Sequence, residues 1–346
     1  MPTPEPPHKK KEKKKYKRKK RILILEIILI IIACIIAFGA YIFSKLDNID
    51  WDDNSIYQND LSDSNMKGYT NIALFGVDSR ENDLTKNTRS DSIIIASINK
   101  RSKKVKLVSI YRDTYVYIPE HGYTKLNHAY AYGGPKLAVE TINRNFDMNI
   151  TDFVTVNFSA VTDAVDALSG ITIDITEDEL NEVNRYAKDV ARINNKEWSK
   201  IKKAGSQTLT GVQATGYCRV RYTKGGDFTR AERQRKVVEA ILDKAKHSNP
   251  VKLANAADKV LPQICTGLSG TEFTSLALSL PFYHIEDQCG FPFDKDPTTI
   301  NKASVVVSTT LSSNVTKLHE YLFGTNEYKP SETVTKISSE ISQRYR

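Results

Sequence analysis

The feature that most constrains this chain is an apolar run beside a cluster of positive charges. Residues 22–44 read ILILEIILIIIACIIAFGAYIFS, and no side chain from Ile27 to Phe43 is charged. About 22 helical residues at 1.5 Å each span about 33 Å, enough to cross the hydrocarbon core of a bilayer. A cleaved signal peptide has a shorter apolar region with a small-residue cleavage site, whereas this run continues through Tyr41 and Phe43 to Lys45. We therefore predict an uncleaved transmembrane helix.

The charge distribution predicts the direction in which this helix crosses the membrane. Of the 50 basic and 41 acidic residues, eleven and two lie in residues 1–21, so this tail accounts for the whole formal charge of +9. The positive-inside rule makes the tail cytoplasmic and the rest extracellular, and the tail would lie against anionic membrane lipid. The remainder has no net charge, which argues against a nucleic-acid partner. We expect a single-pass protein of the cell membrane.

Composition divides the extracellular part into a stalk, one folded domain and a tail. Residues 45–68 are rich in Asp, Asn and Ser and have no apolar period, which predicts an extracellular stalk. Residues 69–324 have the length of one large domain. Residues 325–346 are polar, and we predict a C-terminal tail that frays. The very polar stretch 174–195 is interpreted as a surface excursion.

Strands and helices alternate through the predicted domain. Apolar runs predict strands at 71–77, 92–99, 105–118, 153–158 and 171–175, with a hairpin joining the second to the third through NKRSKK. Periodic patterns predict helices at 135–145, 159–168, part of 176–192, 210–217, 229–246, 251–264, 271–279 and 312–323. The interleaving predicts an α/β fold, a three-layer α/β/α sandwich with a central mixed β-sheet, preceded by one transmembrane helix.

The number and spacing of the cysteine and histidine residues argue against a disulfide scaffold and a zinc site. Cys218, Cys265 and Cys289 are too few for a disulfide scaffold, and whether Cys265 pairs with Cys289 stays open. Cys218 lies in an apolar alternation, which predicts a buried thiol rather than a nucleophile. The six His residues are scattered without HxxxH or CxxC spacing, so we expect no zinc site. The chain contains neither GxSxG nor GxxxxGK[ST].

Charged residues interrupt the apolar strands. They stand at or near strand ends and around one helix start, at Asp78, Arg89, Asp91, Arg112, Lys125, Arg219, Arg221, Asp227, Arg230 and Gln234. Residues two apart share a face of an extended chain, and residues four apart share a face of a helix. Clustered guanidinium groups suit phosphate oxygens, and paired carboxylates suit Mg²⁺. The set therefore predicts a pyrophosphate site with a metal, although each residue alone is equally compatible with a solvated ion pair.

Five blocks carry a family resemblance. They read NIALFGVDSR, TRSDSIIIASIN, VSIYRDTYVYIP, KLNHAYAYGG and VRYTKGGDFTRAERQRKVV. In this order, over about residues 69–245, the chain resembles the LytR-CpsA-Psr family; after residue 250 the resemblance is looser. Tyr111 stands where the family usually has Pro, and Cys218 where Ala or Val is common. Neither departure removes a charged group.

The resemblance implies a cell-envelope phosphotransferase. Such an enzyme takes a glycopolymer, such as wall teichoic acid or capsule, from an undecaprenyl-pyrophosphate carrier. It joins the polymer through a phosphodiester to a hydroxyl of peptidoglycan. The prenyl chain would lie in an apolar tunnel between sheet and helices, so we expect an apolar cavity that opens at the arginine cluster, flanked by residues 93–95, 161–168 and 237–242.

The resemblance also implies a role for each charged residue. Asp78 and Asp91 correspond to the carboxylates that hold Mg²⁺, for which Mn²⁺ is an alternative. Asp227 corresponds to the base that accepts the proton of the acceptor hydroxyl, and Arg112 is the second residue assigned to catalysis. The pyrophosphate clamp would comprise Arg89, Arg112, Lys125, Arg219, Arg221, Arg230 and Gln234.

Three other functions fit parts of the pattern. A prenyl-pyrophosphate pyrophosphatase would use the same site with water as acceptor, and the sequence does not separate the two. A DNA-binding regulator would need a cytoplasmic reading domain, and residues 1–21 are too short for one. A non-catalytic binder of prenyl-linked intermediates, or a regulator of envelope assembly, would not need the full set of Asp and Arg residues.

Overall fold

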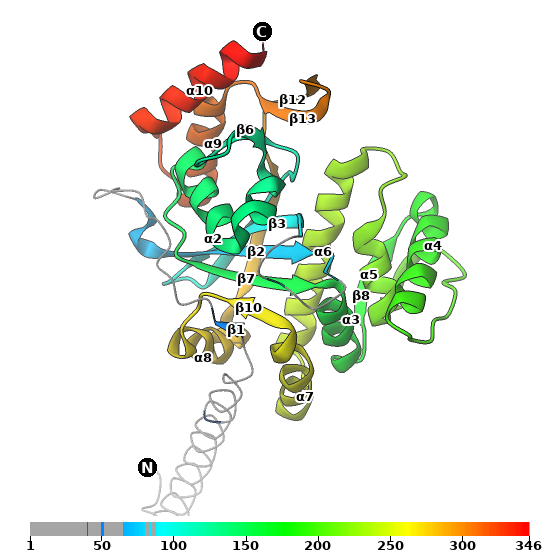
Figure 1. The fold of residues 1–346 in the computed structure, drawn as a ribbon. Helices are drawn as coiled ribbons and strands as arrows, with labels where there is room; N and C mark the ends of the chain where they lie inside the picture. The colour runs from blue at the N-terminus through cyan, green and yellow to red at the C-terminus, as the bar shows by residue number, and fades with distance from the viewer. Residues whose placement is uncertain (1–39, 41–49, 52–64, 80–83, 85–87, 346) are drawn as a thin grey trace, which may run out of the picture.

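A computed structural model describes residues 40, 50–51, 65–79, 84 and 88–345. Their centre is a seven-stranded sheet (Figure 1). In spatial order its strands are β1 (Asp50–Trp51), β10 (Ile264–Thr266), β7 (Asp152–Asn157), β2 (Tyr69–Val77), β3 (Ser90–Asn99), β4 (Lys104–Ile110) and β11 (His284–Phe291). β2 runs antiparallel to β3 and parallel to β7, and β3 runs antiparallel to β4, so the sheet is mixed as predicted.

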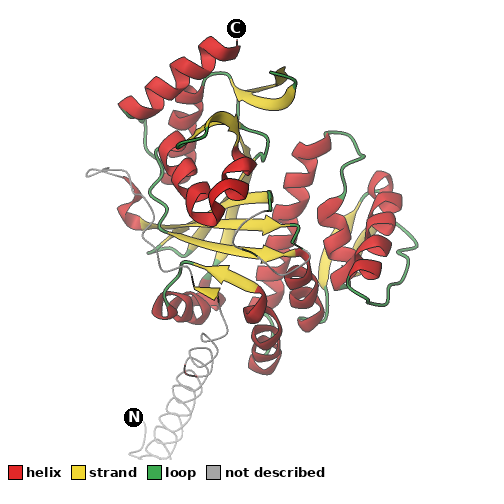
Figure 2. Cartoon of the chain, in the orientation of Figure 1, coloured by secondary structure: helices red, strands yellow, loops and turns green. Residues whose placement is uncertain are grey.

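Alternate residues of the central strands feed two separate cores. On one face, Phe75 and Ile95 pack with α2 (Leu126–Phe146), α9 (Leu311–Phe323) and α10 (Glu332–Tyr345). On the other face, Ile94 and neighbouring side chains pack with α6 (Gly226–Lys246) and α8 (Gly270–Ser279). Because successive strand residues point to opposite faces, both faces of the sheet are apolar and both are covered by helices (Figure 2).

A second group of elements forms the right-hand lobe of Figure 1. It shares one core that includes Val183 and Tyr217, and Val237 connects this core to α6. The polar stretch interpreted as a surface excursion is the helix α4, begun by a capping box at Thr176. The elements of this lobe are α3 (Phe158–Ala167), β8 (Ile171–Ile175), α4 (Glu177–Ile193), β9 (Gly205–Leu209) and α5 (Gly211–Arg219). α7 (Pro250–Val260) packs on α3.

Besides β8, which pairs with β9 in the lobe, two short strand pairs lie outside the main sheet. They are β5 (Tyr115–Ile118) with β6 (Gly122–Lys125), and β12 (Lys295–Ile300) with β13 (Ala303–Ser308). The predicted strand 105–118 is therefore wrong as one element: it ends at Ile110 and resumes in β5 after the charged residues Arg112 and Asp113. Short 3-10 turns complete the fold at η2 (Asn65–Gly68), η3 (Leu261–Gln263) and η4 (Leu280–Phe282).

The prediction that the C-terminal tail frays is wrong. Residues Glu332–Tyr345 form α10, with Val334, Ile337 and Ile341 buried in the core shared with α2 and α9. These three positions are spaced by three and four residues, so the helix presents one apolar face to the domain. The folded domain therefore extends to the end of α10.

The structure bears on two further expectations, one about the N-terminal part of the chain and one about the pairing of Cys265 with Cys289. The predicted membrane helix, the basic tail and most of the stalk lie outside the described residues; within the described ones, no helix combines the length and hydropathy needed to cross a bilayer. Where the predicted stalk is described, the prediction is wrong: Asp50–Trp51 pair with β10, and Met66 in η2 is buried in the core. Cys265 and Cys289 are free thiols in β10 and β11. Four strands separate them, which is about 24 Å at the usual strand spacing, so they do not pair.

Candidate active site

Two strand-end carboxylates meet at one edge of the sheet. Val77, the last residue of β2, pairs with Ser90, the first residue of β3, so Asp78, which follows Val77, and Asp91, the second residue of β3, both lie near this edge. Asp78 and Asp91 consequently line one cavity of about 230 Å³. Its walls are completed by Phe158, Tyr186, Cys218, Arg219, Arg221, Arg230 and Gln234. Six of the predicted site residues therefore surround a single cavity.

Arg219 and Arg221 reach this cavity in a different way from that predicted. Arg219 is the last residue of α5, and neither Val220 nor Arg221 is part of a strand, so the pair does not belong to a strand. The Arg219 guanidinium lies over the ring of Phe158, 5.2 Å from its centroid, and 5.9 Å from that of Tyr186. These cation–π contacts orient Arg219 toward the cavity.

Arg112 connects the acidic groups of the site. It donates to Asp91, and its Nη2 lies 3.6 Å from Oδ2 of Asp227. Its Nε lies 3.8 Å from Oδ2 of Asp113. Burial disfavours the charged guanidinium, but attraction to the three carboxylates outweighs it and raises the pKa of Arg112. Arg112 is therefore a permanent cation at the centre of the site.

Asp227 lies among three cations. Besides Arg112, its carboxylate approaches Nη1 of Arg230 at 3.3 Å and Nε of Arg221 at 3.6 Å, and its side chain is 43% exposed. The sequence placed it just before the helix, but α6 begins at Gly226, so Asp227 is in the first turn. Gly225 caps the helix with φ at 94°, where any Cβ would lie 2.2 Å from Oγ1 of Thr229. That turn holds Asp227 above the arginine cluster.

Arg230 is the most deeply buried cation of the cluster, at 4% relative exposure. Its Nη2 donates to the carbonyl oxygen of Asp91, while its Nε has no hydrogen-bond partner among the described residues. Burial, together with repulsion from Arg112, lowers the pKa of Arg230 to about 10. Burial is the larger cause, so a bound anion beside Arg230 would offset the cost of keeping this buried guanidinium charged.

Lys125 and Arg89 lie at the periphery of the site. Lys125, at the end of β6, pairs with Asp113 at 3.2 Å, and Asp113 also pairs with Arg112. Arg89 is exposed. Burial and the charges of Arg89 and Lys125 lower the pKa of His128, which puts both cations near that imidazole. The structure brings Lys125 to the cluster through Asp113 and leaves Arg89 at its edge.

Asp78 and Asp91 by themselves supply only part of the ligand set that a metal ion needs. Among the described residues no group of three or more His, Cys, Asp or Glu side chains is placed to hold an ion. Asp78 and Asp91 face the same small cavity. Mg²⁺ is commonly bound by one or two carboxylates together with substrate phosphates. The pair therefore fits a metal that arrives with, or is completed by, a phosphate-bearing ligand.

An apolar cavity adjoins the charged one, as predicted. Its volume is about 170 Å³, and it lies between the sheet and α3, α5 and α6. Phe158, Cys218 and Gln234 line both cavities. Other lining residues fall in the three predicted segments, at Ile94, Val161, Val237, Val238 and Ile241. Cys218 is a buried thiol as predicted, and burial raises its pKa to about 12.

Sequence reasoning missed residues that position the site. Arg233 is buried on α6 and donates through Nε to Glu179 at 2.7 Å. It also donates to the carbonyl of Val220 at 3.1 Å and to Oγ1 of Thr223 at 2.6 Å. Arg233 therefore ties α4, α6 and the Arg221 loop together. Its place beside Gln234 in a charged helix offered no signal, because a buried Arg and an exposed one look alike in sequence.

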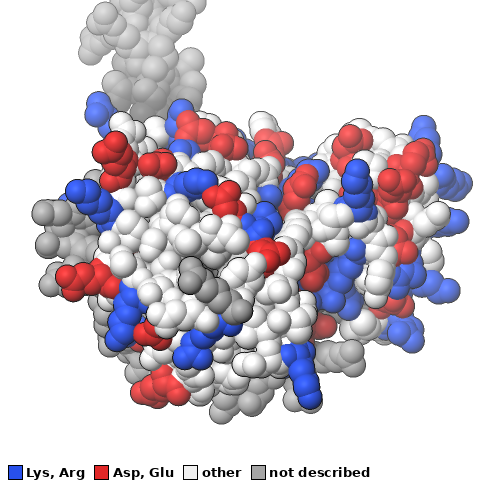
Figure 3. Space-filling model, turned by 90° about the horizontal axis from the view of Figure 1, so that it is seen from above, with Lys and Arg blue, Asp and Glu red and all other residues white. Residues whose placement is uncertain are grey.

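On the face seen from above, basic and acidic side chains are interspersed (Figure 3). Together, fold and site define a mixed α/β protein whose anion-binding cluster opens onto an apolar cavity. The chain belongs to the LytR_cpsA_psr family, whose model matches residues 38–316.

Relatives and solved structures agree with this assignment. The polyisoprenyl-teichoic acid–peptidoglycan teichoic acid transferase TagT of Bacillus subtilis (strain 168) is 33% identical over 217 residues. The match covers 60% of this chain and 65% of that relative, so the chain spans less than two thirds of its length. A structure described as TagT bound to LIIa-WTA matches with a TM-score of 0.61 and 23% identity, over 80% of this chain and 98% of the other.

A further structure contains a lipid. It is described as the LytR-CPS2A-psr family protein YwtF (TagT) with bound octaprenyl pyrophosphate lipid. It matches with a TM-score of 0.57 and 23% identity, over 80% of this chain and 100% of the other. At these identities the two structures establish the shared fold.

Proposed function

We propose that this protein is a cell-envelope phosphotransferase. It would move a glycopolymer from an undecaprenyl-pyrophosphate carrier to a hydroxyl of peptidoglycan and form a phosphodiester. The observation that carries the proposal is the direct junction of the arginine-rich cavity with the apolar cavity through Phe158, Cys218 and Gln234. A prenyl pyrophosphate has the same two parts, an anionic head and an apolar chain. The names of the similar transferases and of the lipid-bound structure support the same substrate class.

The cations of the site would act by neutralising charge on the pyrophosphate. Phosphoryl transfer depends mainly on positioning and electrostatic stabilisation. Arg219, Arg221 and Arg230 face the cavity, and Arg112 lies behind Asp91. A Mg²⁺ ion on Asp78 and Asp91 would add Lewis-acid stabilisation of the phosphate oxygens. Asp227 would accept the proton of the attacking hydroxyl.

The sugars of the donor would extend into a third cavity. This polar cleft of about 580 Å³ contains Asp78 and Arg219 at the end shared with the charged site. Neutral amide groups of the kind that hydrogen-bond sugar hydroxyls also line it, at Asn157, Asn194, Asn195 and Gln263. Its volume lies in the usual range for ligand sites.

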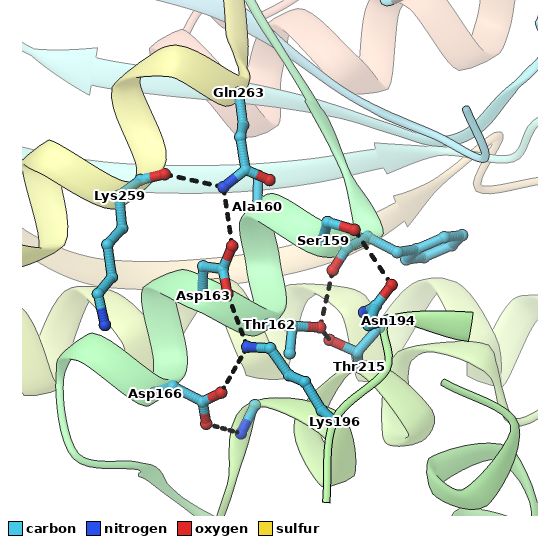
Figure 4. A network of polar contacts seen from close by, with 12 residues as sticks. Ser159, Ala160, Thr162, Asp163, Asp166, Asn194, Lys196, Thr215, Lys259 and Gln263 are labelled. Atoms are coloured by element: carbon cyan, nitrogen blue, oxygen red, sulfur yellow. Dashed lines mark hydrogen bonds and ion pairs between the residues drawn. The ribbon is translucent and has the colours of Figure 1, made fainter. Parts of the chain in front are cut away.

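A network of polar contacts holds one wall of this cleft (Figure 4). Lys196 donates to Asp163 at 2.6 Å and to Asp166 at 2.8 Å, and Gln263 donates to Asp163 at 2.8 Å. These residues come from α3, from the segment after α4 and from η3. The network keeps three separate segments together around the cleft.

The membrane arrangement completes the proposal. A helix over residues 22–44 and a basic cytoplasmic tail would hold the domain outside the cell, close to a lipid-linked donor. Tethering raises the effective concentration of that donor without any new contact. A prenyl-pyrophosphate pyrophosphatase remains the second candidate, because water has access to the same Asp227.

The test uses the full chain in detergent micelles with a prenyl-pyrophosphate-linked saccharide as donor. Products are analysed with and without uncrosslinked peptidoglycan. A phosphodiester-linked product with prenyl phosphate release is expected only with acceptor present; equal release without acceptor would favour the pyrophosphatase.

A pair of variants tests the metal carboxylate. Asp91→Asn should lower Mg²⁺-dependent transfer by about two orders of magnitude or more while the protein stays folded. Asp243→Asn makes the same change on an exposed carboxylate, with 70% side-chain exposure, and should leave transfer unchanged. Full activity of Asp91→Asn, or activity that a chelator does not affect, would contradict the metal role.

A further inference from the structure

A fourth cavity touches the site and contains the proposed base. It holds about 160 Å³ and lies between the start of α6, the segment after β4 and the hairpin β12–β13. Asp227 lines this cavity, and it lines neither the cavity that contains Asp78 nor the apolar one. Asp91, Arg230 and Gln234 line both this cavity and the charged one, so the two meet at the arginine cluster.

We propose that this cavity is the acceptor subsite, where the hairpin β12–β13 receives a hydroxyl-bearing sugar of peptidoglycan. The inference rests on the proposed function and adds the place of its second substrate. A base must lie within about 2.6–3.2 Å of the hydroxyl whose proton it takes. A hydroxyl at that distance from Asp227 lies in, or at the mouth of, the hairpin cavity.

The other cavities have chemistry suited to the donor. The apolar one is walled almost wholly by aliphatic and aromatic side chains, which suits a prenyl chain. The amide-lined cleft begins at Asp78 and Arg219, away from Asp227. Of these four cavities, the hairpin cavity is the one that Asp227 lines, and this assigns the acceptor to it.

Its lining suits one sugar ring. Pro297 and the buried Val306 give apolar surface, and Phe228 packs edge-on against Tyr111 with the ring centroids 4.5 Å apart. Ser304 adds an exposed hydroxyl on the hairpin, and Asp113 adds a carboxylate. Charged and hydroxyl side chains line the cavity beside this apolar surface, which suits a sugar with its hydroxyl groups and apolar ring face.

Backbone contacts fix the position of the hairpin β12–β13 relative to the catalytic cluster. The amide of Val306 donates to the carbonyl of Asp113 at 2.8 Å, and Thr114 forms a parallel bridge with Val306. Asp113 pairs in turn with Arg112. A sugar placed by the hairpin is thereby placed relative to Arg112 and the donor phosphate.

The reaction in this arrangement is balanced. The acceptor oxygen forms a bond to the phosphorus that carries the glycopolymer. The bond from that phosphorus to the bridging oxygen breaks, and undecaprenyl phosphate leaves with the electron pair. The hydroxyl proton passes to Asp227.

The test places a bulky side chain at the rim. Ser304→Tyr narrows the cavity, and Thr299→Tyr is the matched control, because Thr299 is the exposed cross-strand partner of Ser304 but does not line the cavity. Full-chain protein is assayed at fixed donor with increasing amounts of a short uncrosslinked peptidoglycan strand. We expect Ser304→Tyr to raise the KM for this acceptor about tenfold or more, with the donor KM and octaprenyl pyrophosphate binding unchanged.

The outcomes separate the two proposals. Absence of transfer by the unmodified protein with this acceptor would count against the proposed function itself. Normal transfer by the unmodified protein and an unchanged acceptor KM in Ser304→Tyr would overturn the subsite alone. If Ser304→Tyr no longer binds octaprenyl pyrophosphate, Ser304→Gln is measured in its place, and an acceptor KM equal to that of Thr299→Gln would overturn the subsite.

Discussion

The buried ion pair between Glu179 and Arg233 gives the sharpest stability test. Its side chains are 9% and 3% exposed, and Nε of Arg233 lies 2.7 Å from Oε1 of Glu179. Glu179 also accepts from the amide of Thr176 at 2.9 Å in the capping box that begins α4. Gln serves in a capping box as well as Glu does. Glu179→Gln therefore removes the charge and keeps the cap.

The expected loss in free energy of unfolding depends on the Arg233 charge that stays buried. Removal of one partner from a buried ion pair costs about 3–5 kcal/mol, because the other charge remains without compensation. Arg233 keeps its bonds to Val220 and Thr223, and a Gln oxygen still accepts from Nε, so we expect about 3 kcal/mol for Glu179→Gln. Glu179→Ala also loses the cap and should cost about 1 kcal/mol more.

The assay is urea unfolding of the full chain at pH 7, with Glu182→Gln as control. Glu182 lies on the same helix and pairs with Arg185, whose side chain is 47% exposed, so its loss should cost below about 1 kcal/mol. A free energy of unfolding for Glu179→Gln within about 0.5 kcal/mol of the parent would refute the reasoning.

The same pair predicts a pH dependence. Burial alone would raise the pKa of Glu179, but the Thr176 amide and Arg233 outweigh it and lower that pKa. A carboxylate with a lowered pKa in the folded state stabilises the protein above its unfolded pKa, here 4.5. This stability is lost as the pH falls through the folded value. The difference between parent and Glu179→Gln should therefore be full at pH 7 and shrink below pH 4.5.

Two further predictions concern the cleft and the apolar cavity. Lys196→Met removes two half-buried ion pairs from the cleft wall and should lower the free energy of unfolding by about 1–2 kcal/mol in urea, whereas the exposed Lys317→Met should change it by under 1 kcal/mol. Because its pKa is raised to about 12, the Cys218 thiol should resist a thiol reagent at pH 8 in the folded protein and react after unfolding; rapid modification of the native chain at Cys218 would contradict its burial.

The position of the two carboxylates was predictable because it depends on neighbouring strands. Asp78 follows an apolar run and Asp91 precedes the next one, so pairing of those runs alone brings them together. The apolar cavity followed in the same way from segments flanking charged strand ends. Local pattern and one strand pairing were enough for this part of the site.

The end of α5 shows where the hydrophobic pattern of the sequence fails to predict secondary structure. Every residue from Gly211 to Cys218 is buried, because α5 packs against α3, α4 and α6. A helix that is buried all round has no polar face, so its end can be mistaken for the alternation of a strand. The helix itself was predicted, at 210–217, but Arg219 and Arg221 were placed on an extended strand. The structure brings Arg219 to the cavity from the end of α5 and Arg221 from the loop that follows.

The hairpin β12–β13 could not be placed from sequence. Its strands pair mainly with each other, and it reaches the site through residues far away along the chain. Val306 contacts the backbone of Asp113 and Thr114, and Lys295 lies over the rings of Tyr111 and Phe228. Pro297 within β12 also weakens the strand pattern, since Pro is disfavoured in strand interiors. Contacts of this kind depend on tertiary packing and leave no periodic signal.

The depth of the apolar cavity gives a last test of the lipid part of the proposal. Ile241 lines this cavity and is partly exposed, so Trp at this position can fill the cavity without a new buried void. If the added ring displaces two methylene groups of the prenyl chain, the loss is about 1.6 kcal/mol, or about fifteenfold in affinity.

Equilibrium binding of octaprenyl pyrophosphate to Ile241→Trp should therefore weaken by about this factor, while binding of inorganic pyrophosphate stays the same, because the charged cavity is untouched. Ile241→Val keeps the cavity open and should bind both ligands as the parent does. Unchanged octaprenyl pyrophosphate affinity in a folded Ile241→Trp protein would mean that the chain lies elsewhere. Equal weakening of both ligands would mean that the substitution had disturbed the arginine cluster, and the effect could not then be assigned to the chain.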